Sequence, residues 1–317
     1  MGTQFDLVIV GGGIAGMTAA IYAARANLRT LILEKSVCGG LVNTTHVVEN
    51  FPSYPSIGGM DLMEKVRAHV EGLGVEIREV VEIESFGLEH GLKNVATDEG
   101  VFTAPALILA TGRKPRKLAI DTNCEQIHYC AICDGSCYKG RPVMVVGGGN
   151  SGVDESLYLR TLGVSRIVLI EELDRLLASE KSCQNLLACP EVEAFVSTRI
   201  AEIRSDGRLE SVLLYNTATG ETFERKVDGI FVYIGQDPQT DLLRGQVPLD
   251  DWGYIVVDDQ MRTSLPGVFA AGDVIHKKFR QITTAMADGT IAALSAVAYL
   301  AEQGEQCKPA ASVAVTK

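Results

Sequence analysis

The feature that most constrains this chain is a glycine-rich motif that occurs twice, at Gly11–Gly16 and at Gly147–Gly152. Each copy follows a short run of apolar residues and precedes a segment with the composition of a helix. The two copies are 136 residues apart. A strand buried on both faces, a GxGxxG loop and a helix form the unit that binds a dinucleotide pyrophosphate at the helix N-terminus. The chain is therefore expected to contain two α/β dinucleotide-binding units built on parallel sheets.

The first copy of the motif has its full sequence context. A predicted strand at 7–10 leads into the loop, and a predicted helix at 17–26 follows it. The next predicted strand, 30–33, ends in Glu34, which lies 23 residues after Gly11. A carboxylate at this spacing accepts hydrogen bonds from an adenosine ribose. The alternative is that the glycines serve only a tight turn. The glycines expected to bind the cofactor are Gly11, Gly13 and Gly16.

The second copy repeats this pattern with a similar acid. The predicted strand 167–170 ends in Glu171, which lies 24 residues after Gly147. A carboxylate at this strand end repels a 2′-phosphate and suits a free 2′-hydroxyl, so NADH is preferred over NADPH. The alternative is that Glu171 is a solvated charge and that this unit holds no nucleotide. The glycines expected to bind the nucleotide are Gly147, Gly149 and Gly152.

A pair of cysteines lies just before the second copy. Cys130 and Cys133 are separated by two residues and are followed at once by Asp134. Two thiols at this spacing can close a small disulfide ring, or offer a thiolate with its resolving partner beside it. The carboxyl group of Asp134 could give or take the proton that moves between thiol and thiolate. The alternative is a structural zinc held with Cys124 and Cys137, but only one CxxC is present and no metal site is expected.

Other segments complete the predicted organisation. A buried strand ends in the turn at Gly112, and the charged, proline-containing segment 113–116 is typical of a linker. A second linker is expected at 236–238. A later strand runs into Gly272 and Asp273, where the carboxylate could bind a ribityl or phosphate-linked hydroxyl, or cap a helix. A long helix of small residues is expected over about 282–300.

Composition limits the class of protein and of partner. The length of 317 residues suggests about two domains, and the net charge of −11 makes a nucleic-acid partner unfavourable. Eight scattered cysteines are too few for a secreted disulfide scaffold of this size, which indicates a reducing compartment. No signal-peptide pattern opens the chain, and no apolar run of transmembrane length is expected. A cytoplasmic protein without a membrane partner is therefore predicted.

Taken together, these residues resemble the low-molecular-weight thioredoxin reductases of the pyridine-nucleotide disulfide oxidoreductases. The motifs that carry the resemblance span nearly the whole chain. They are GGGIAG at 11–16, VENFP at 48–52, ATG at 110–112, CAICDG at 130–135, GGGNSG at 147–152, AAGD at 270–273 and RQ at 280–281. The resemblance implies two Rossmann-like three-layer domains, the second inserted into the first. FAD would be held by 1–115 and 245–317, and the redox CxxC would lie in a nicotinamide-type domain at 116–244.

The resemblance also implies roles for individual residues. Cys133 would face the flavin and take electrons from it, Cys130 would attack the disulfide of thioredoxin, and Asp134 would be the acid and base. The protein would be a homodimer whose two domains rotate so that the thiols and the nicotinamide alternate at the flavin. The FAD contacts would come from Gly11, Gly13, Gly16, Glu34, Asn50, Gly112, Gly272, Asp273, Arg280 and Gln281.

The chain departs from the family at the second nucleotide site. NADPH-dependent members carry a His-Arg-Arg cluster after the second dinucleotide strand, and here Glu171, Glu172 and Leu173 take its place. An acid at this position is similar to that in the NADH-using flavoprotein of alkyl hydroperoxide reductase. It is also similar to reductases that draw electrons from ferredoxin or another flavin donor. The intact loop at 147–152 favours NADH.

Two other functions remain open at this point. The partner of the dithiol could be a peroxiredoxin-like or glutaredoxin-like protein instead of thioredoxin. The chain could also be a flavin-binding redox sensor that uses the thiols as a switch and turns over little. Among the nearby side chains, His128 could stabilise a thiolate, but the ordinary hydrogen bonds of a loop histidine are expected. Cys38, Cys183, Cys189 and Cys307 are expected to be plain core or surface thiols.

Overall fold

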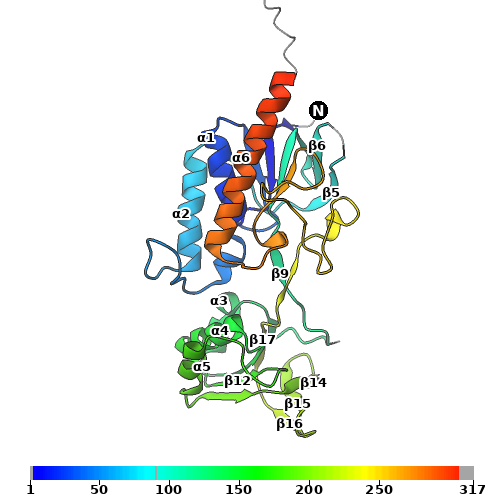
Figure 1. Ribbon diagram of the computed structural model, residues 1–317. Helices are drawn as coiled ribbons and strands as arrows, with labels where there is room; N and C mark the ends of the chain where they lie inside the picture. Colours follow the sequence, from blue (N-terminus) through cyan, green and yellow to red (C-terminus); the bar gives the residue numbers. More distant parts are fainter. Residues whose placement is uncertain (1–2, 90, 121, 307–317) are drawn as a thin grey trace, which may run out of the picture. The chain divides into compact units, whose positions relative to one another are not determined.

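The computed structural model describes residues 3–89, 91–120 and 122–306 of the chain, which divides into two compact units (Figure 1). The first unit comprises Met1–Lys114 and Asp237–Lys317, and the second comprises Pro115–Gln236. The second unit is therefore inserted into the first, and the predicted α/β class with two Rossmann-like units is confirmed. The predicted thiol at Cys307 and most of the C-terminal tail lie outside the described residues.

Residues 237–244, which the sequence groups with the inserted domain, belong to the first unit. The backbone N–H of Gln239 donates to the carbonyl oxygen of Gly112 at 3.0 Å. The Lys114 ammonium also lies 2.7 Å from Asp241. The chain therefore contacts the first unit again within a few residues of leaving the inserted unit. The assignment of the two units to FAD and to nicotinamide stays a prediction.

The first unit is built on a five-stranded sheet in which all adjacent strands are parallel. Every residue of the four strands at 7–10, 30–33, 106–109 and 268–270 is buried. Strands covered on both faces must be apolar throughout, which is why they read as short continuous hydrophobic runs. In spatial order the strands are β19 (Val268–Ala270), β8 (Ala106–Leu109), β2 (Leu7–Val10), β3 (Thr30–Leu33) and β4 (Glu76–Arg78).

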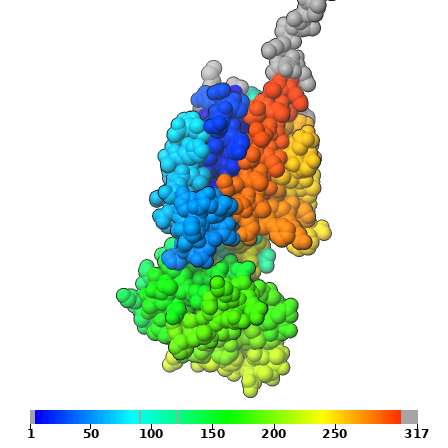
Figure 2. Space-filling view, turned by 60° about the vertical axis from the view of Figure 1, so that its left-hand side comes forward, coloured from blue at the N-terminus to red at the C-terminus, as the bar shows by residue number. Residues whose placement is uncertain are grey.

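Three helices cover one face of this sheet: α1 (Ile14–Arg25), α2 (Gly59–Gly72) and α6 (Ile282–Gln306). In Figure 2 the residues of α1 lie between those of α2 and α6. Helices α1 and α6 approach closely because Gly289 packs against the backbone of Ala15, where a Cβ would collide with the carbonyl oxygen.

By length and composition alone, Ile282–Gln303 is also apolar enough to cross a membrane, although no such run was expected from the sequence.

The other face of the sheet is covered by a second, four-stranded sheet. Its buried side chains include Val95 and Phe102, which pack in one cluster with Val8 and Leu31 of the parallel sheet. The first unit thus has three layers, with one apolar core on each face of the parallel sheet. The strands, in spatial order, are β1 (Thr3–Gln4), β7 (Gly100–Ala104), β6 (Lys93–Thr97) and β5 (Ile83–Gly87).

The inserted unit repeats this three-layer plan. A five-stranded parallel sheet is covered on one face by α3 (Ala131–Asp134), α4 (Asn150–Thr161) and α5 (Glu180–Leu187). An antiparallel sheet of β14 (Thr198–Ser205), β15 (Leu209–Asn216) and β16 (Thr222–Arg225) covers the other face. The strands of the parallel sheet, in spatial order, are β10 (Ile127–His128), β17 (Gly229–Val232), β11 (Pro142–Val146), β12 (Arg166–Ile170) and β13 (Val192–Phe195).

The two predicted linkers form a small sheet of their own. Strand β9 (Arg113–Pro115) pairs with β18 (Gln236–Pro238). Beside this pair, the backbone N–H of Arg116 donates to the carbonyl oxygen of Gly235 at 3.0 Å. The two ends of the inserted unit therefore lie together. Short 3₁₀ turns occur at Gly40–Thr44 (η1), Gly135–Tyr138 (η2), Asp241–Leu243 (η3) and Gly272–Val274 (η4).

Candidate active site

The two cysteines of the CxxC form a disulfide, with Cα atoms 5.4 Å apart. Cys130 precedes the one-turn helix α3 in extended backbone, and its sulfur accepts a hydrogen bond from the backbone N–H of Cys133 at 3.1 Å. Cys130 is half-buried and Cys133 is exposed. The pair is therefore held at the start of a helix, where exposed backbone N–H groups stabilise a thiolate.

The start of α3 is attached to the carboxyl end of strand β17. The Tyr233 hydroxyl accepts a hydrogen bond from the backbone N–H of Ala131 at 3.0 Å. Burial of this phenol, together with the charge of Glu155, raises its pKa, so it stays neutral. Because Tyr233 directly follows an inner strand, this bond ties the first residue of α3 to the parallel sheet of the inserted unit.

A histidine links the predicted acid to a buried tyrosine. His128 Nδ1 lies 3.2 Å from a carboxylate oxygen of Asp134, and His128 Nε2 lies 2.6 Å from the Tyr138 hydroxyl. The imidazole also packs against Phe231, with ring centroids 5.1 Å apart. The ordinary hydrogen bonding expected of His128 is found at Nε2, and Nδ1 in addition faces the candidate acid.

The first glycine loop has the shape that a pyrophosphate needs. Gly11 adopts a φ of +110°, and a Cβ on it would collide with the backbone at Ala110. A Cβ on Gly16 would collide with the Gly11 carbonyl, so helix α1 can start only because both are glycine. No atom lies within 4 Å of a Cβ built on Gly13. No side chain caps α1, and its first turn carries no acid, so its backbone N–H groups fit a bound anion.

Glu34 is fixed at the same end of the sheet. One carboxylate oxygen accepts from the backbone N–H of Gly12 at 2.6 Å, and the other accepts from Ser36 at 2.8 Å. The carboxylate is thus held by the loop itself. Each of its oxygens retains a further lone pair, which suits bonds from the two hydroxyls of a ribose.

The second glycine loop reproduces this geometry almost atom for atom. Gly147 also has a φ of +110°, a Cβ on Gly152 would collide with the Gly147 carbonyl, and Gly149 again faces open space. Glu171 accepts from the backbone N–H of Gly148 at 2.6 Å and from Leu173 at 2.9 Å. The two sites are therefore equivalent in backbone and in acid, although they lie in different units.

The loop after Glu171 carries no cationic cluster. It folds back so that the N–H of Leu177 donates to the Gly148 carbonyl at 2.8 Å, while Leu173 and Leu177 stay about half exposed. Arg175 in this loop lies 3.6 Å from Asp174, with both side chains largely exposed.

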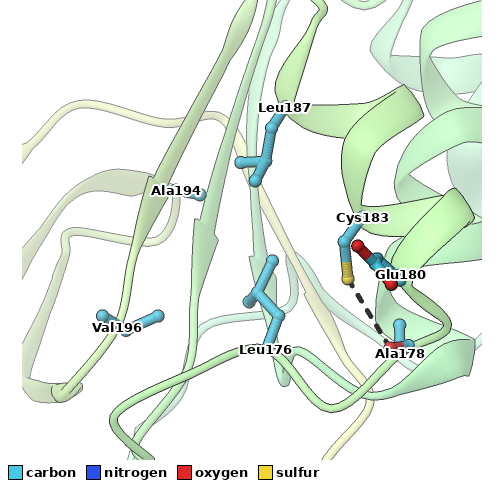
Figure 3. Close-up of a pocket in the computed structure, with 7 residues that line it drawn as sticks. All are labelled: Leu176, Ala178, Glu180, Cys183, Leu187, Ala194 and Val196. Atoms are coloured by element: carbon cyan, nitrogen blue, oxygen red, sulfur yellow. Dashed lines mark hydrogen bonds between the residues drawn. The ribbon is translucent and has the colours of Figure 1, made fainter.

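A pocket of about 480 Å³ lies between this loop, α5 and the strand end at Val196 (Figure 3). None of its lining residues is positively charged: Leu176, Ala178, Glu180, Cys183, Leu187, Ala194 and Val196.

A charged cluster in the first unit centres on Asp273, in the 3₁₀ turn η4 that follows the buried strand β19. Arg113 lies 3.0 Å from one carboxylate oxygen. Lys277 lies 3.2 Å from the other and 2.7 Å from Asp288. The second oxygen of Asp273 nevertheless has no hydrogen bond among the described residues, and the same holds for Nε of Arg113 and of Arg280. Buried polar atoms without hydrogen-bond partners fit a polar ligand bound here.

Other residues predicted to bind FAD come from distant segments of the sequence and also belong to the first unit. Asn50 donates to the side-chain oxygen of Gln281 at 3.1 Å, across 231 residues of sequence. Arg280 stacks on Tyr254, with its guanidinium carbon 4.1 Å from the ring centroid. Gly272 adopts a φ of +82° and lies against Ala15 at the start of α1. Gly112, with a φ of +63°, follows the neighbouring strand β8. The donor set therefore fits FAD, whereas the role of each residue stays a prediction.

The other described cysteines show no metal cluster, and within the described residues no group of three metal-ligating side chains is found. Cys38, Cys124 and Cys189 are buried free thiols, Cys183 is partly buried, and Cys137 is exposed. Burial, reinforced by Glu79 and Glu34, raises the pKa of Cys38 to about 12, so that thiol is unreactive at neutral pH.

Several residues of these sites were not singled out from the sequence. Tyr138 and Tyr233 contact the redox segment, but isolated tyrosines in a chain carry no positional signal. Glu155 is half-buried with one carboxylate oxygen fully covered, and this desolvation together with Asp154 raises its pKa to about 7. Lys277 had a usable signal, because it lies between the predicted cofactor residues Asp273 and Arg280.

Comparison with known proteins follows these observations. Residues 5–289 match the family model described as pyridine nucleotide-disulphide oxidoreductase. The chain is 42% identical over 301 residues to a 34.2 kDa protein in the rubredoxin operon of Clostridium pasteurianum, covering 94% of this chain and 97% of that one. It is 39% identical over 305 residues to the thioredoxin reductase of Treponema pallidum, covering 95% and 98% respectively.

Solved structures give the same result. The crystal structure of Lactococcus lactis thioredoxin reductase in its FR conformation matches with a TM-score of 0.88 at 38% identity, over 94% of this chain and 99% of that one. The thioredoxin reductase of T. acidophilum matches with a TM-score of 0.87 at 36% identity, over 93% and 98%.

Proposed function

The chain belongs to the pyridine nucleotide-disulphide oxidoreductase family, and its relatives there include thioredoxin reductases. We therefore propose that it reduces the disulfide of thioredoxin with FAD as cofactor. The observation that carries the proposal is the Cys130–Cys133 disulfide at the start of α3, in a unit inserted into a dinucleotide-binding fold. FAD, when bound, supplies the two electrons that reduce this disulfide.

The cysteines then transfer the electrons by thiol–disulfide exchange. Cys130 attacks the disulfide of thioredoxin and forms a mixed disulfide. Cys133 attacks the sulfur of Cys130, which restores the Cys130–Cys133 bond and releases reduced thioredoxin. Asp134 takes the proton of the attacking thiol and gives it to the departing thiolate. Release of free thiols from oxidised thioredoxin by the reduced flavoenzyme tests this function.

We infer that the nucleotide donor is NADH. The equivalence of Glu171 and Glu34 supports this, because the same carboxylate geometry at the first site suits a ribose with free hydroxyls. The loop after Glu171 and the nearby pocket offer no cationic cluster for a 2′-phosphate. An NADPH site would need such groups.

Anaerobic stopped-flow tests the donor. The flavin absorbance near ~450 nm is followed after mixing with NADH or NADPH in turn. Rapid bleaching by NADH and much slower bleaching by NADPH is the expected result. Equal rates, or a faster reaction with NADPH, would contradict the assignment of Glu171.

A second candidate donor is a small electron-transfer protein. One observation favours it: a relative with 42% identity is a protein in a rubredoxin operon. The exposed Leu173 and Leu177 are compatible with a protein surface as well as with a nucleotide. Under this alternative neither nucleotide bleaches the flavin in the stopped-flow experiment, whereas a reduced ferredoxin or rubredoxin does.

We also infer a homodimer in the cytoplasm, in keeping with the reducing compartment that the cysteine content indicates. Sedimentation of the purified flavoprotein at micromolar concentration tests the assembly. A single species with the mass of one chain would contradict it.

A further inference from the structure

Three side chains contact one another in a line within the redox segment: Asp134, His128 and Tyr138. The imidazole touches the carboxylate through Nδ1 at 3.2 Å and the phenol through Nε2 at 2.6 Å. All three come from one short stretch of the inserted unit. His128 ends strand β10, Asp134 ends helix α3, and Tyr138 ends the 3₁₀ turn η2.

The partners of the imidazole determine which nitrogen carries the proton. A carboxylate repels the lone pair of a ring nitrogen and attracts an N–H, so the nitrogen that faces Asp134 at 3.2 Å is expected to carry the proton. The neutral ring then offers Nε2 as an acceptor, and the Tyr138 hydroxyl must donate to it. Burial, with a smaller effect of the Asp134 charge, raises the pKa of Tyr138 to about 12. The phenol therefore remains a donor across the physiological range.

The surroundings leave the imidazole little freedom. Phe231 packs on the ring of His128 and also meets Tyr138 edge-on, with centroids 5.5 Å apart. Tyr138 is buried, and its ring packs so closely on Gly229 that a Cβ there would collide with it. The charged or titratable groups that act on Tyr138 are Asp134, Cys137, Cys124 and Arg141. No other contact of a titratable group with His128 is observed among the described residues.

We propose that His128 is a positioning residue for Asp134, held in its Nδ1–H tautomer by Tyr138, in the thiol–disulfide exchange of the Cys130–Cys133 pair. This rests on the proposed role of Asp134 as acid and base. In that exchange Cys133 loses its proton to the Asp134 carboxylate and forms a bond to the Cys130 sulfur. The bond from Cys130 to the substrate sulfur breaks, and the leaving thiolate takes the proton from Asp134. His128 keeps the carboxylate in one orientation for both transfers.

The test uses the whole flavoprotein and a small substrate. The rate at which the reduced enzyme cleaves bis(2-hydroxyethyl) disulfide is measured from about pH 5 to about pH 9 for five variants and a control. His128→Phe removes the hydrogen bond to Tyr138 and the polar contact with Asp134, and His128→Asn keeps a donor near the position of Nδ1. Asp134→Asn removes the acid, alone and together with His128→Phe. Tyr138→Phe removes only the hydroxyl.

The expected pattern is non-additive. His128→Phe and Asp134→Asn each slow the reaction roughly 10-fold and flatten its pH profile in the same way, and the double variant is no slower than Asp134→Asn. His128→Asn recovers most of the rate, and Tyr138→Phe loses a few-fold. Tyr215→Phe on strand β15, which removes a hydroxyl elsewhere in the same unit, leaves both rate and profile unchanged.

Two results would overturn the proposal while leaving the role of Asp134 intact. One is a double variant in which the two losses multiply, because His128 would then act independently of Asp134. The other is a His128→Phe enzyme slowed equally at every pH, which is the behaviour of a purely structural residue. If Asp134→Asn has no effect, the role of Asp134 and the proposal both fail. If thioredoxin is not reduced while the small disulfide shows the expected pattern, only the proposed protein substrate fails.

Discussion

At the scale of single residues, the redox segment contains three cysteines within eight positions, and they differ in state. Cys130 and Cys133 are joined, whereas Cys137 is an exposed free thiol. We expect Cys130→Ser and Cys133→Ser each to lower thioredoxin reduction by at least about 10³-fold, since exchange needs both sulfurs. Cys137→Ser is the matched control and should retain activity. Comparable loss in the control would show that the third thiol takes part in the exchange.

Glu171 gives a prediction about nucleotide affinity. Glu171→Ala removes a carboxylate that would bind ribose hydroxyls, so KM for NADH should rise roughly 10- to 100-fold with a smaller change in kcat. The neighbouring Glu172 makes no such contact with the glycine loop, and Glu172→Ala serves as the control. Steady-state kinetics with both variants measures the difference. An unchanged KM in Glu171→Ala would remove the support for NADH.

Glu155 makes stability depend on pH. Its pKa is raised from the ordinary 4.5 to about 7, first by burial and then by Asp154, so the folded protein binds this proton more tightly than the unfolded chain. Stability is therefore lost as the pH rises through this window. Glu155→Gln should raise the free energy of unfolding above neutral pH by up to roughly 3 kcal/mol, and change it little near pH 4.5. Urea unfolding of the inserted unit at both pH values measures this, and an equal effect at both would contradict it.

Among the single residues, those with a fixed spacing were accessible from sequence. Glu34 and Glu171 follow from their distance to the glycine loops, and the disulfide follows from the CxxC. His128 could not be assigned a partner, because its contact with Asp134 depends on how the chain turns between β10 and α3. Tyr233 lies 102 residues from Ala131, and no local pattern connects them.

At the scale of elements, the pairing of α1 with α6 depends on a single glycine. Gly289 lies where a Cβ would meet the Ala15 carbonyl, at the helix that begins in the first glycine loop. We expect Gly289→Val to destabilise the first unit by about 1–3 kcal/mol and to weaken FAD binding, because α1 would be displaced. Ala298→Val on an exposed position of α6 is the control. Flavin release on dilution and thermal unfolding measure the two effects, and normal flavin retention by Gly289→Val would contradict the expectation.

Element types were accessible from the sequence wherever the strands were long enough and buried. Strand β3 lies over 30–33 as expected, and the strands 7–10 and 167–170 are found with at most one residue of difference. The short strands β9 and β18 were expected only as linkers. Three residues show no periodicity, and their pairing with each other is a long-range property that a local pattern does not contain.

At the scale of the whole molecule, the inserted unit has the properties of an independent domain. It is a continuous segment, Pro115–Gln236, with two apolar clusters of its own. We expect the excised segment to fold, to form the Cys130–Cys133 disulfide and to unfold cooperatively. Circular dichroism during urea unfolding and thiol counting test this. A segment with exposed apolar surface and no cooperative transition would show that its core needs the first unit.

The meeting of the chain ends at the boundary of the inserted unit also bears on the origin of the molecule. Arg116 and Gly235 are hydrogen-bonded on one side of the junction, and Gly112 and Gln239 on the other. A segment whose ends already touch can enter or leave a host gene in one step without separating the strands of the host sheet. Since host and insert share the same loop and acid, one duplication followed by one insertion suffices to generate the present architecture. The ancestor in this scheme was a single nucleotide-binding domain, and the redox cysteines belong to the copy that moved.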